Sequence, residues 1–257
     1  MKTRKLSPTS AMHYGKLILR LIAFVMAVLF YICKDIWRHI SFTLGEKLPI
    51  LIWIIWIWFA IEIVLRFFPA SIESMGCQKQ FSKNYMPTDA EGTKEENRGV
   101  WLTLGVWIAL NAIIGILYFS HVIDKGILLL ISLFYSVCDM VCILFFCPFQ
   151  TWFMKNKCCT TCRIYNWDYA MMFTPLVFIR SVYTWSLFGL GIALLLEWEF
   201  LHWRYAERFS ERTNQNLACI HCKEKLCAHK TQLRQFQKKL RILRKNAEGK
   251  MLDGENI

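Results

Sequence analysis

Five apolar stretches, each of about twenty residues, constrain the fold of this chain more than any other feature. They occupy residues 17–33, 48–66, 99–119, 126–147 and 185–203. An α-helix of that length crosses the hydrocarbon core of a bilayer, which is about 30 Å thick. The runs are continuous and do not alternate, which predicts helices rather than a β-barrel. The sequence therefore predicts an all-α, polytopic transmembrane helical bundle, multi-pass in the cell membrane.

The first run is expected to remain in the mature protein. It begins only at Leu17, behind a basic leader, and no small-residue cleavage site follows it. A removed signal peptide carries such a site. We therefore count residues 17–33 as a retained span.

Residues 164–179 are the ambiguous segment, because they are apolar but short. They contain Pro175, and Asn166 and Asp168 lie near their start. The segment is compatible with a surface helix, a re-entrant segment or a sixth, short crossing. Its role decides on which side of the membrane the C-terminal tail lies.

Loop charge distinguishes five crossings from six, because cytosolic loops carry an excess of Lys and Arg. With five crossings and a cytosolic N-terminus, 12 basic residues lie inside and 17 outside, which is no clear bias. With six crossings, the cytosolic segments before the tail carry 11 basic residues against 5 outside. The tail adds 13 inside, although long tails count for less in this rule. The charges favour six crossings with both termini cytosolic, and five remain an alternative.

This topology divides the chain into a transmembrane helical domain, residues 1–203, and a cytosolic, basic, cysteine-rich tail, residues 204–257. Apolar residues recur at helical spacing among the Lys and Arg of the tail, which predicts an amphipathic helix that contacts anionic lipid headgroups. They are Leu233, Phe236, Leu240 and Leu243. A solvated helix is the alternative. Membrane topology also accounts for the net charge of +12, so we expect no nucleic-acid partner.

Two short cysteine runs flank the last part of the membrane domain, and each contains a C-x-x-C pair. Two such pairs supply four thiolates, the complement of a tetrahedral zinc site or an iron–sulfur cluster. With six crossings both runs face the cytosol, where thiols are normally kept reduced. We therefore predict one shared metal site, with zinc or iron–sulfur undecided. Its ligands are Cys159, Cys162, Cys219 and Cys222.

Local sites are the alternative to the shared site. In the tail alone, Cys219, Cys222, Cys227 and His229 offer three thiolates and an imidazole within eleven residues. In the shared arrangement Cys158 and Cys227 are spare or second-site thiols. Local sites would form even with the two runs on opposite faces of the membrane. Unpaired thiols, or a disulfide in an oxidising compartment, remain a further alternative.

Charged residues inside the apolar runs form a second candidate site, because taking a charge into hydrocarbon costs about 2.5–3.5 kcal/mol on insertion scales. Asp139 is the deepest, and we expect either a proton or cation site there or a bond across helices to Asn111. Glu62 and Arg66 are one turn apart and predict a local ion pair. Arg20 is close enough to the cytosolic surface for its side chain to snorkel.

Motifs of ordinary enzymes are lacking. The sequence has no phosphate-binding glycine loop, nucleophile elbow or His-Glu-x-x-His motif. Glu199 and His202 have the spacing of a di-iron bundle, but the second copy that such a bundle needs does not occur.

The function that these patterns predict is that of a membrane protein with a cytosol-facing cysteine metal site, acting in membrane redox or electron transfer with a lipid-soluble or protein partner. One alternative is a small transporter or channel with Asp139 in a polar path. The other is a membrane scaffold or assembly factor that recruits a soluble partner. Whether the chain is an enzyme stays open.

Overall fold

The computed structural model of the chain describes residues 8–33, 48–68, 75–88, 98–154 and 161–218. This part of the chain is helical and contains no named strand; an isolated bridge joins Pro87 to Asn214. The prediction of an all-helical bundle is confirmed. The long helices are α1 (Pro8–Ile32), α3 (Leu48–Phe67), α5 (Arg98–Phe119), α6 (Lys125–Leu144) and α8 (Val182–Arg204).

Four helices in the described ranges are long and apolar enough to cross a membrane. They comprise Thr9–Ile32, Arg98–Phe119, Lys125–Leu144 and Val182–Arg204. Large apolar side chains such as Ile22, Ile108 and Leu196 are exposed on their outer faces, as in helices that contact lipid. Both observations indicate a membrane protein.

The ambiguous segment forms three short helices in series: η4 (Arg163–Trp167), α7 (Asp168–Phe173) and η5 (Thr174–Phe178). Tyr169, Met172 and Phe173 are almost completely buried, and α7 packs between α6 and α8. The segment is therefore part of the core of the bundle and not a surface helix. Because 3₁₀-helix rises about 2 Å per residue and α-helix about 1.5 Å, the three pieces together extend about 29 Å.

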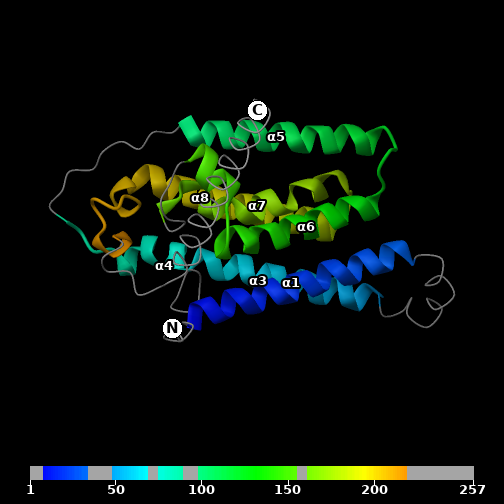
Figure 1. Cartoon of the computed structure of the whole chain (residues 1–257), viewed down its shortest axis with the longest axis horizontal. Helices are drawn as coiled ribbons and strands as arrows, with labels where there is room; N and C mark the ends of the chain where they lie inside the picture. The colour runs from blue at the N-terminus through cyan, green and yellow to red at the C-terminus, as the bar shows by residue number, and fades with distance from the viewer. Residues whose placement is uncertain (1–7, 34–47, 69–74, 89–97, 155–160, 219–257) are drawn as a thin grey trace, which may run out of the picture.

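Contacts at the two ends of this segment fix its direction. Near its start, Arg163 and Trp167 bond to Glu199, which lies close to the end of α8. At its end, Phe178 contacts the rings of Tyr118 and Phe119 at the end of α5. The segment therefore runs along the bundle from one end to the other, antiparallel to α8 (Figure 1).

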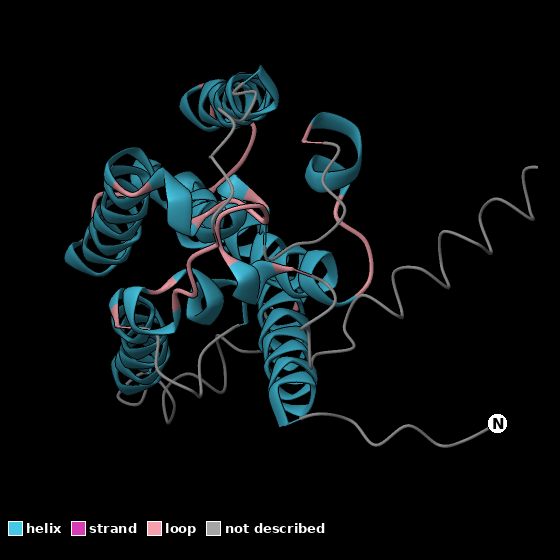
Figure 2. Cartoon of the chain, turned by 90° about the vertical axis from the view of Figure 1, so that its left-hand side faces the viewer, coloured by secondary structure: helices cyan, strands magenta, loops and turns pink. Residues whose placement is uncertain are grey.

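The remaining helices alternate in direction around it. The start of α6 lies against the end of α1, since Gly126 faces the ring of Tyr31. The start of α3 lies against the start of α8, where the rings of Trp53 and Tyr183 are 4.8 Å apart. The start of α1 and the ends of α3, α6 and α8 therefore share one end of the bundle (Figure 1), which faces the viewer in Figure 2.

Helix α5 packs chiefly against the short helices at its two ends, η2 (Phe149–Phe153) and η5. A glycine of α5 lies at each contact, against backbone at Gly99 and against a side chain at Gly115. A Cβ at Gly99 would lie 2.6 Å from the carbonyl oxygen of Phe153, and one at Gly115 would lie 2.7 Å from the ring of Phe178. The middle of α5 is joined to α6 by the rings of Trp107 and Tyr135, 4.9 Å apart.

Beyond α8, the chain folds back at the same end of the bundle onto the loop that follows α3. It contains η6 (Ala206–Arg208) and η7 (Gln215–Leu217), and it meets α4 (Met75–Gln80) and η1 (Ser82–Asn84). Arg208 donates from Nε and Nη2 to the carbonyl oxygen of Gln80, at 3.0 and 2.7 Å. Burial lowers the pKa of the Arg208 guanidinium from its ordinary value. This contact fixes the start of the tail to the bundle.

Candidate functional site

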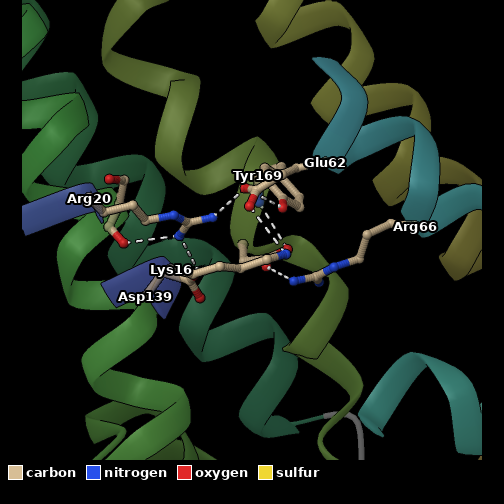
Figure 3. A network of polar contacts seen from close by, with 8 residues as sticks. Lys16, Arg20, Glu62, Arg66, Asp139 and Tyr169 are labelled. Carbon is tan, nitrogen blue, oxygen red and sulfur yellow. Dashed lines mark hydrogen bonds and ion pairs between the residues drawn. The ribbon is translucent and has the colours of Figure 1, made fainter. Parts of the chain in front are cut away.

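Arg20 is the centre of a buried network of charges that joins three helices (Figure 3). Its side chain is 1% exposed. Nη1 donates to Oδ2 of Asp139 at 2.9 Å and to the carbonyl oxygen of Ser136 at 3.0 Å, both in α6. Nη2 donates to Oε2 of Glu62 in α3 at 2.8 Å. The prediction that Arg20 snorkels was wrong, because carboxylates on two neighbouring helices meet the guanidinium inside the bundle.

Glu62 gathers positive charge and a hydroxyl from other helices. Besides Arg20, its carboxylate binds Nζ of Lys16 at 3.1 Å, and the hydroxyl of Tyr169 donates to Oε2 at 3.1 Å. Arg66, its predicted partner, forms an ion pair with Asp168. The partners observed for Glu62 therefore come from other helices, and the predicted local pair with Arg66 stays a prediction.

Arg66 binds Asp168 at the start of α7, with Nη2 2.8 Å from Oδ2. Its guanidinium also lies over the rings of Tyr165 and Tyr169, at 5.5 and 5.0 Å from their centroids. Cations are attracted to the faces of aromatic rings, so these contacts add to the ion pair. Arg66 thus fixes the otherwise ambiguous segment to the end of α3.

The network is balanced in charge. It contains three basic groups, Lys16, Arg20 and Arg66, and three carboxylates, Glu62, Asp139 and Asp168. Balance matters here because an uncompensated charge in a low-dielectric interior is costly, whereas a paired one is tolerated.

His13 lies beside this network, one turn before Lys16 on α1. Its imidazole is buried, and neither ring nitrogen has a hydrogen-bond partner in the described part of the chain.

Asp139 has a second role, because it also lines a cavity of about 460 Å³. Within the described residues, its Oδ2 binds Arg20 and its Oδ1 has no partner. The expected bond to Asn111 was wrong: the Asn111 amide donates to the carbonyl oxygen of Trp107 in its own helix, at 3.0 Å. Asp139 therefore contacts the ion network on one side and the cavity on the other.

The cavity lies among α5, α6, η2, η4 and α7, and apolar and aromatic side chains form most of its wall. Asp139 and Asp168 are the charged residues among those that line it. Asp168 has both oxygens engaged, since Oδ1 accepts from the backbone N–H of Tyr169 and Oδ2 binds Arg66. The lining also includes four cysteines, Cys138, Cys142, Cys147 and Cys162.

Of the predicted metal ligands, the structure describes Cys162 alone. Its side chain is buried against Val100, Ile164 and Trp167 at the end of the bundle where α8 finishes. The others lie outside the described residues: Cys158, Cys159, Cys219, Cys222, Cys227 and His229. In the ranges that the structure describes, no three His, Cys, Asp or Glu residues form a group suited to a metal ion.

Sequence reasoning missed several members of the site. Lys16 and Arg20 are four residues apart and so share a helix face, with His13 one turn earlier, and this spacing was an available signal. Tyr169 and the carbonyl of Ser136 carried no comparable signal, because their roles depend on which helices are neighbours.

Comparison with known proteins adds no relative: no protein-family model, curated protein or solved structure matches this chain.

Proposed function

We propose that this protein is a small membrane transporter whose path includes the cavity and Asp139. One observation carries the proposal: a single carboxylate belongs both to a buried, charge-balanced network and to the wall of a cavity. Ionisable residues inside membrane domains commonly mark substrate or ion paths.

The contacts of Arg20 support a rearrangement during transport. Because Arg20 bonds both Asp139 and Glu62, it keeps one carboxylate when the other moves or takes up a ligand. Losing every partner would leave a bare buried charge, which costs several kcal/mol. A guanidinium shared between two acids can therefore give up one contact without being left unpaired, as the rearrangement of an alternating carrier would require.

The proposal includes a topology of six crossings in the cell membrane, with both termini cytosolic. One support is the course of residues 163–178 from one end of the bundle to the other, about 29 Å by helical rise. The other is the excess of basic residues expected at the end where α8 finishes, which is the cytosolic end in this topology.

An impermeant thiol reagent on intact cells tests this topology, with labelled peptides identified by mass spectrometry. We expect Cys222 to stay unlabelled. A cysteine introduced by Ser120→Cys, in the short connection between α5 and α6, should label as the matched control. Labelling of Cys222 from outside would contradict six crossings.

Water access to the cavity tests the transport path itself. In sealed inside-out vesicles, Cys138 in a Cys142→Ser, Cys147→Ser background should react with an impermeant reagent, because the proposed path leads from the cavity to water at the cytosolic face. Cys33, at the opposite end of the bundle, is the control for sealed vesicles and should not react. Complete protection of Cys138 would contradict a transport path through the cavity.

A second proposed function is the cytosolic cysteine metal site, holding zinc or an iron–sulfur cluster that serves redox chemistry. Arg163 and Trp167 bond to Glu199, and residues 205–218 fold back at the same end. Cys162 and the chain leading to Cys219 therefore start from one end of the bundle. We also propose that the basic tail contacts anionic headgroups.

Metal content and visible absorbance of the purified protein test this second function. A broad visible band that bleaches on reduction supports a cluster, and stoichiometric zinc in a colourless protein supports a zinc site. Cys222→Ser should lower the metal content. Absence of both metals from protein purified without chelator would contradict the site.

A further inference from the structure

We propose that the cavity binds a neutral, membrane-soluble molecule bearing a hydroxyl group, which enters sideways from the bilayer and donates its hydroxyl hydrogen to Asp139. This inference rests on the proposed transport function and gives its substrate class. It is carried by three observations: where the cavity opens, how its charges are balanced, and which acceptor remains available.

The cavity opens on the flank of the bundle. Three of its lining residues have large exposed fractions: 42% for Leu110 of α5, and 50% and 37% for Phe134 and Val141 of α6. All three lie within helices long and apolar enough to cross a membrane. A flank between two such helices faces hydrocarbon, so the occupant arrives dissolved in the bilayer.

The packing of α5 explains this opening. Helix α5 is fixed at its ends, by Gly99 against Phe153 and by Gly115 against Phe178. Between these points, Trp107 reaches across to Thr174, with Nε1 3.3 Å from the hydroxyl oxygen. A helix tied at both ends and bridged by one large side chain leaves space beside the bridge. A volume of about 460 Å³ falls within the range of small-molecule sites.

The charges of the network exclude an ion as the preferred occupant. Three basic and three acidic groups already balance one another, as described above. A cation or anion in the cavity would add an uncompensated charge to a low-dielectric interior, which is costly. A neutral molecule adds none.

The available acceptor specifies the polar group of that molecule. In the described part of the chain, Oδ1 of Asp139 has no partner, while both oxygens of Asp168 are engaged. An ionised carboxylate accepts hydrogen bonds and donates none. The occupant must therefore bring a donor, and a hydroxyl group on an apolar body fulfils this need without charge.

Three probes with the same alkyl chain test the inference on the purified, delipidated full-length protein: 1-hexadecanol, hexadecane and hexadecylamine. We expect 1-hexadecanol to bind at least about tenfold more tightly than either of the others, because a hydrogen bond to a charged acceptor is worth about that much. Equal affinity for hexadecanol and hexadecane would overturn the role of Asp139. Tightest binding of hexadecylamine would overturn the neutral class.

Two variants assign the preference to the site. Asp139→Leu should lose the preference for the alcohol, whereas Asp124→Asn should keep it, because Asp124 lies exposed at the start of the same helix. If Asp139→Leu does not fold, Cys138→Phe, which fills the cavity, should weaken binding of both hexadecanol and hexadecane. If whichever of Asp139→Leu and Cys138→Phe folds binds the two probes as the unchanged protein does, the ligand does not bind in this cavity.

The binding experiment and the water-access experiment test two different claims, so either claim can be overturned while the other stands. Preference for hexadecanol with no water access to Cys138 would leave the ligand class standing and overturn transport. Water access to Cys138 without a preference for hexadecanol would leave transport standing and overturn the ligand class.

Discussion

The two sides of α6 differ in how they are held. Toward α1, the side chain of Asp139 and the carbonyl of Ser136 bind Arg20, which also binds Glu62 of α3. Toward α5, the contact is an aromatic pair beside a cavity of about 460 Å³. Directional, buried contacts thus fix one side, and apolar contacts leave space on the other. A network of charges can therefore hold the helices together while one of its members also lines a cavity.

The largest expected effect on stability is on the side of α6 that faces α1, where Asp139 binds Arg20. Arg20→Leu removes the partner of Asp139 and one partner of Glu62, and leaving a buried charge unpaired costs about 3–5 kcal/mol. The free energy of unfolding, measured in mixed detergent, should fall by that amount. Arg180→Leu, which changes an exposed arginine, is the control and should change it little. A fall of similar size in both variants would contradict the network.

A smaller effect is expected where α7 packs on α8. A Cβ at Gly191 would lie 3.1 Å from the backbone nitrogen of Ala170, and overpacking of this kind costs about 1–3 kcal/mol. Gly189, two residues earlier in α8, has open space at the same position. Gly191→Ala should lower the unfolding temperature, and Gly189→Ala should hold or raise it. The reverse order would show that residues 168–173 do not pack against α8 as described.

The contact of Glu199 with Arg163 is expected to contribute less, because these side chains are 22% and 18% exposed. Glu199→Gln keeps an acceptor for the indole N–H of Trp167 but loses the ion pair, at a cost of about 1 kcal/mol or less. Combined with Arg163→Gln, the loss of stability should be smaller than the sum of the two separate losses, because the two side chains share one contact. Losses that simply add would contradict the ion pair.

The smallest effect on stability is expected on the side of α6 that faces α5 and the cavity. Cys138→Phe places its larger side chain in existing space, so the free energy of unfolding should change by less than about 1 kcal/mol. Binding of 1-hexadecanol, measured on the same sample, should nevertheless be lost. A large loss of stability would mean that the cavity is not available space.

The long helices could be predicted from sequence because each carries its own signal. The apolar run 99–119 became Arg98–Phe119, and 185–203 became Val182–Arg204. Residues 164–179 stayed ambiguous because they are short for a crossing at the rise of an α-helix, whereas most of the segment is the more extended 3₁₀ form.

The partners of the buried charges could not be predicted in the same way. Helical spacing detects neighbours three or four residues apart, and it pointed from Glu62 to Arg66. The observed partner of Glu62 is Arg20, 42 residues away, and Asp139 is 119 residues from Arg20. Such pairs follow from which helices are neighbours, and so does the cavity left beside α5.

A double-mutant cycle between Arg20 and Asp139 tests the central claim most directly, namely that Asp139 belongs to the buried network while facing the cavity. The free energy of unfolding is measured for Arg20→Leu, Asp139→Leu and the double variant. The contact at 2.9 Å predicts a coupling of about 1–3 kcal/mol, with the double variant less damaged than the two single changes together imply. Effects that add to within about 0.5 kcal/mol would contradict the account.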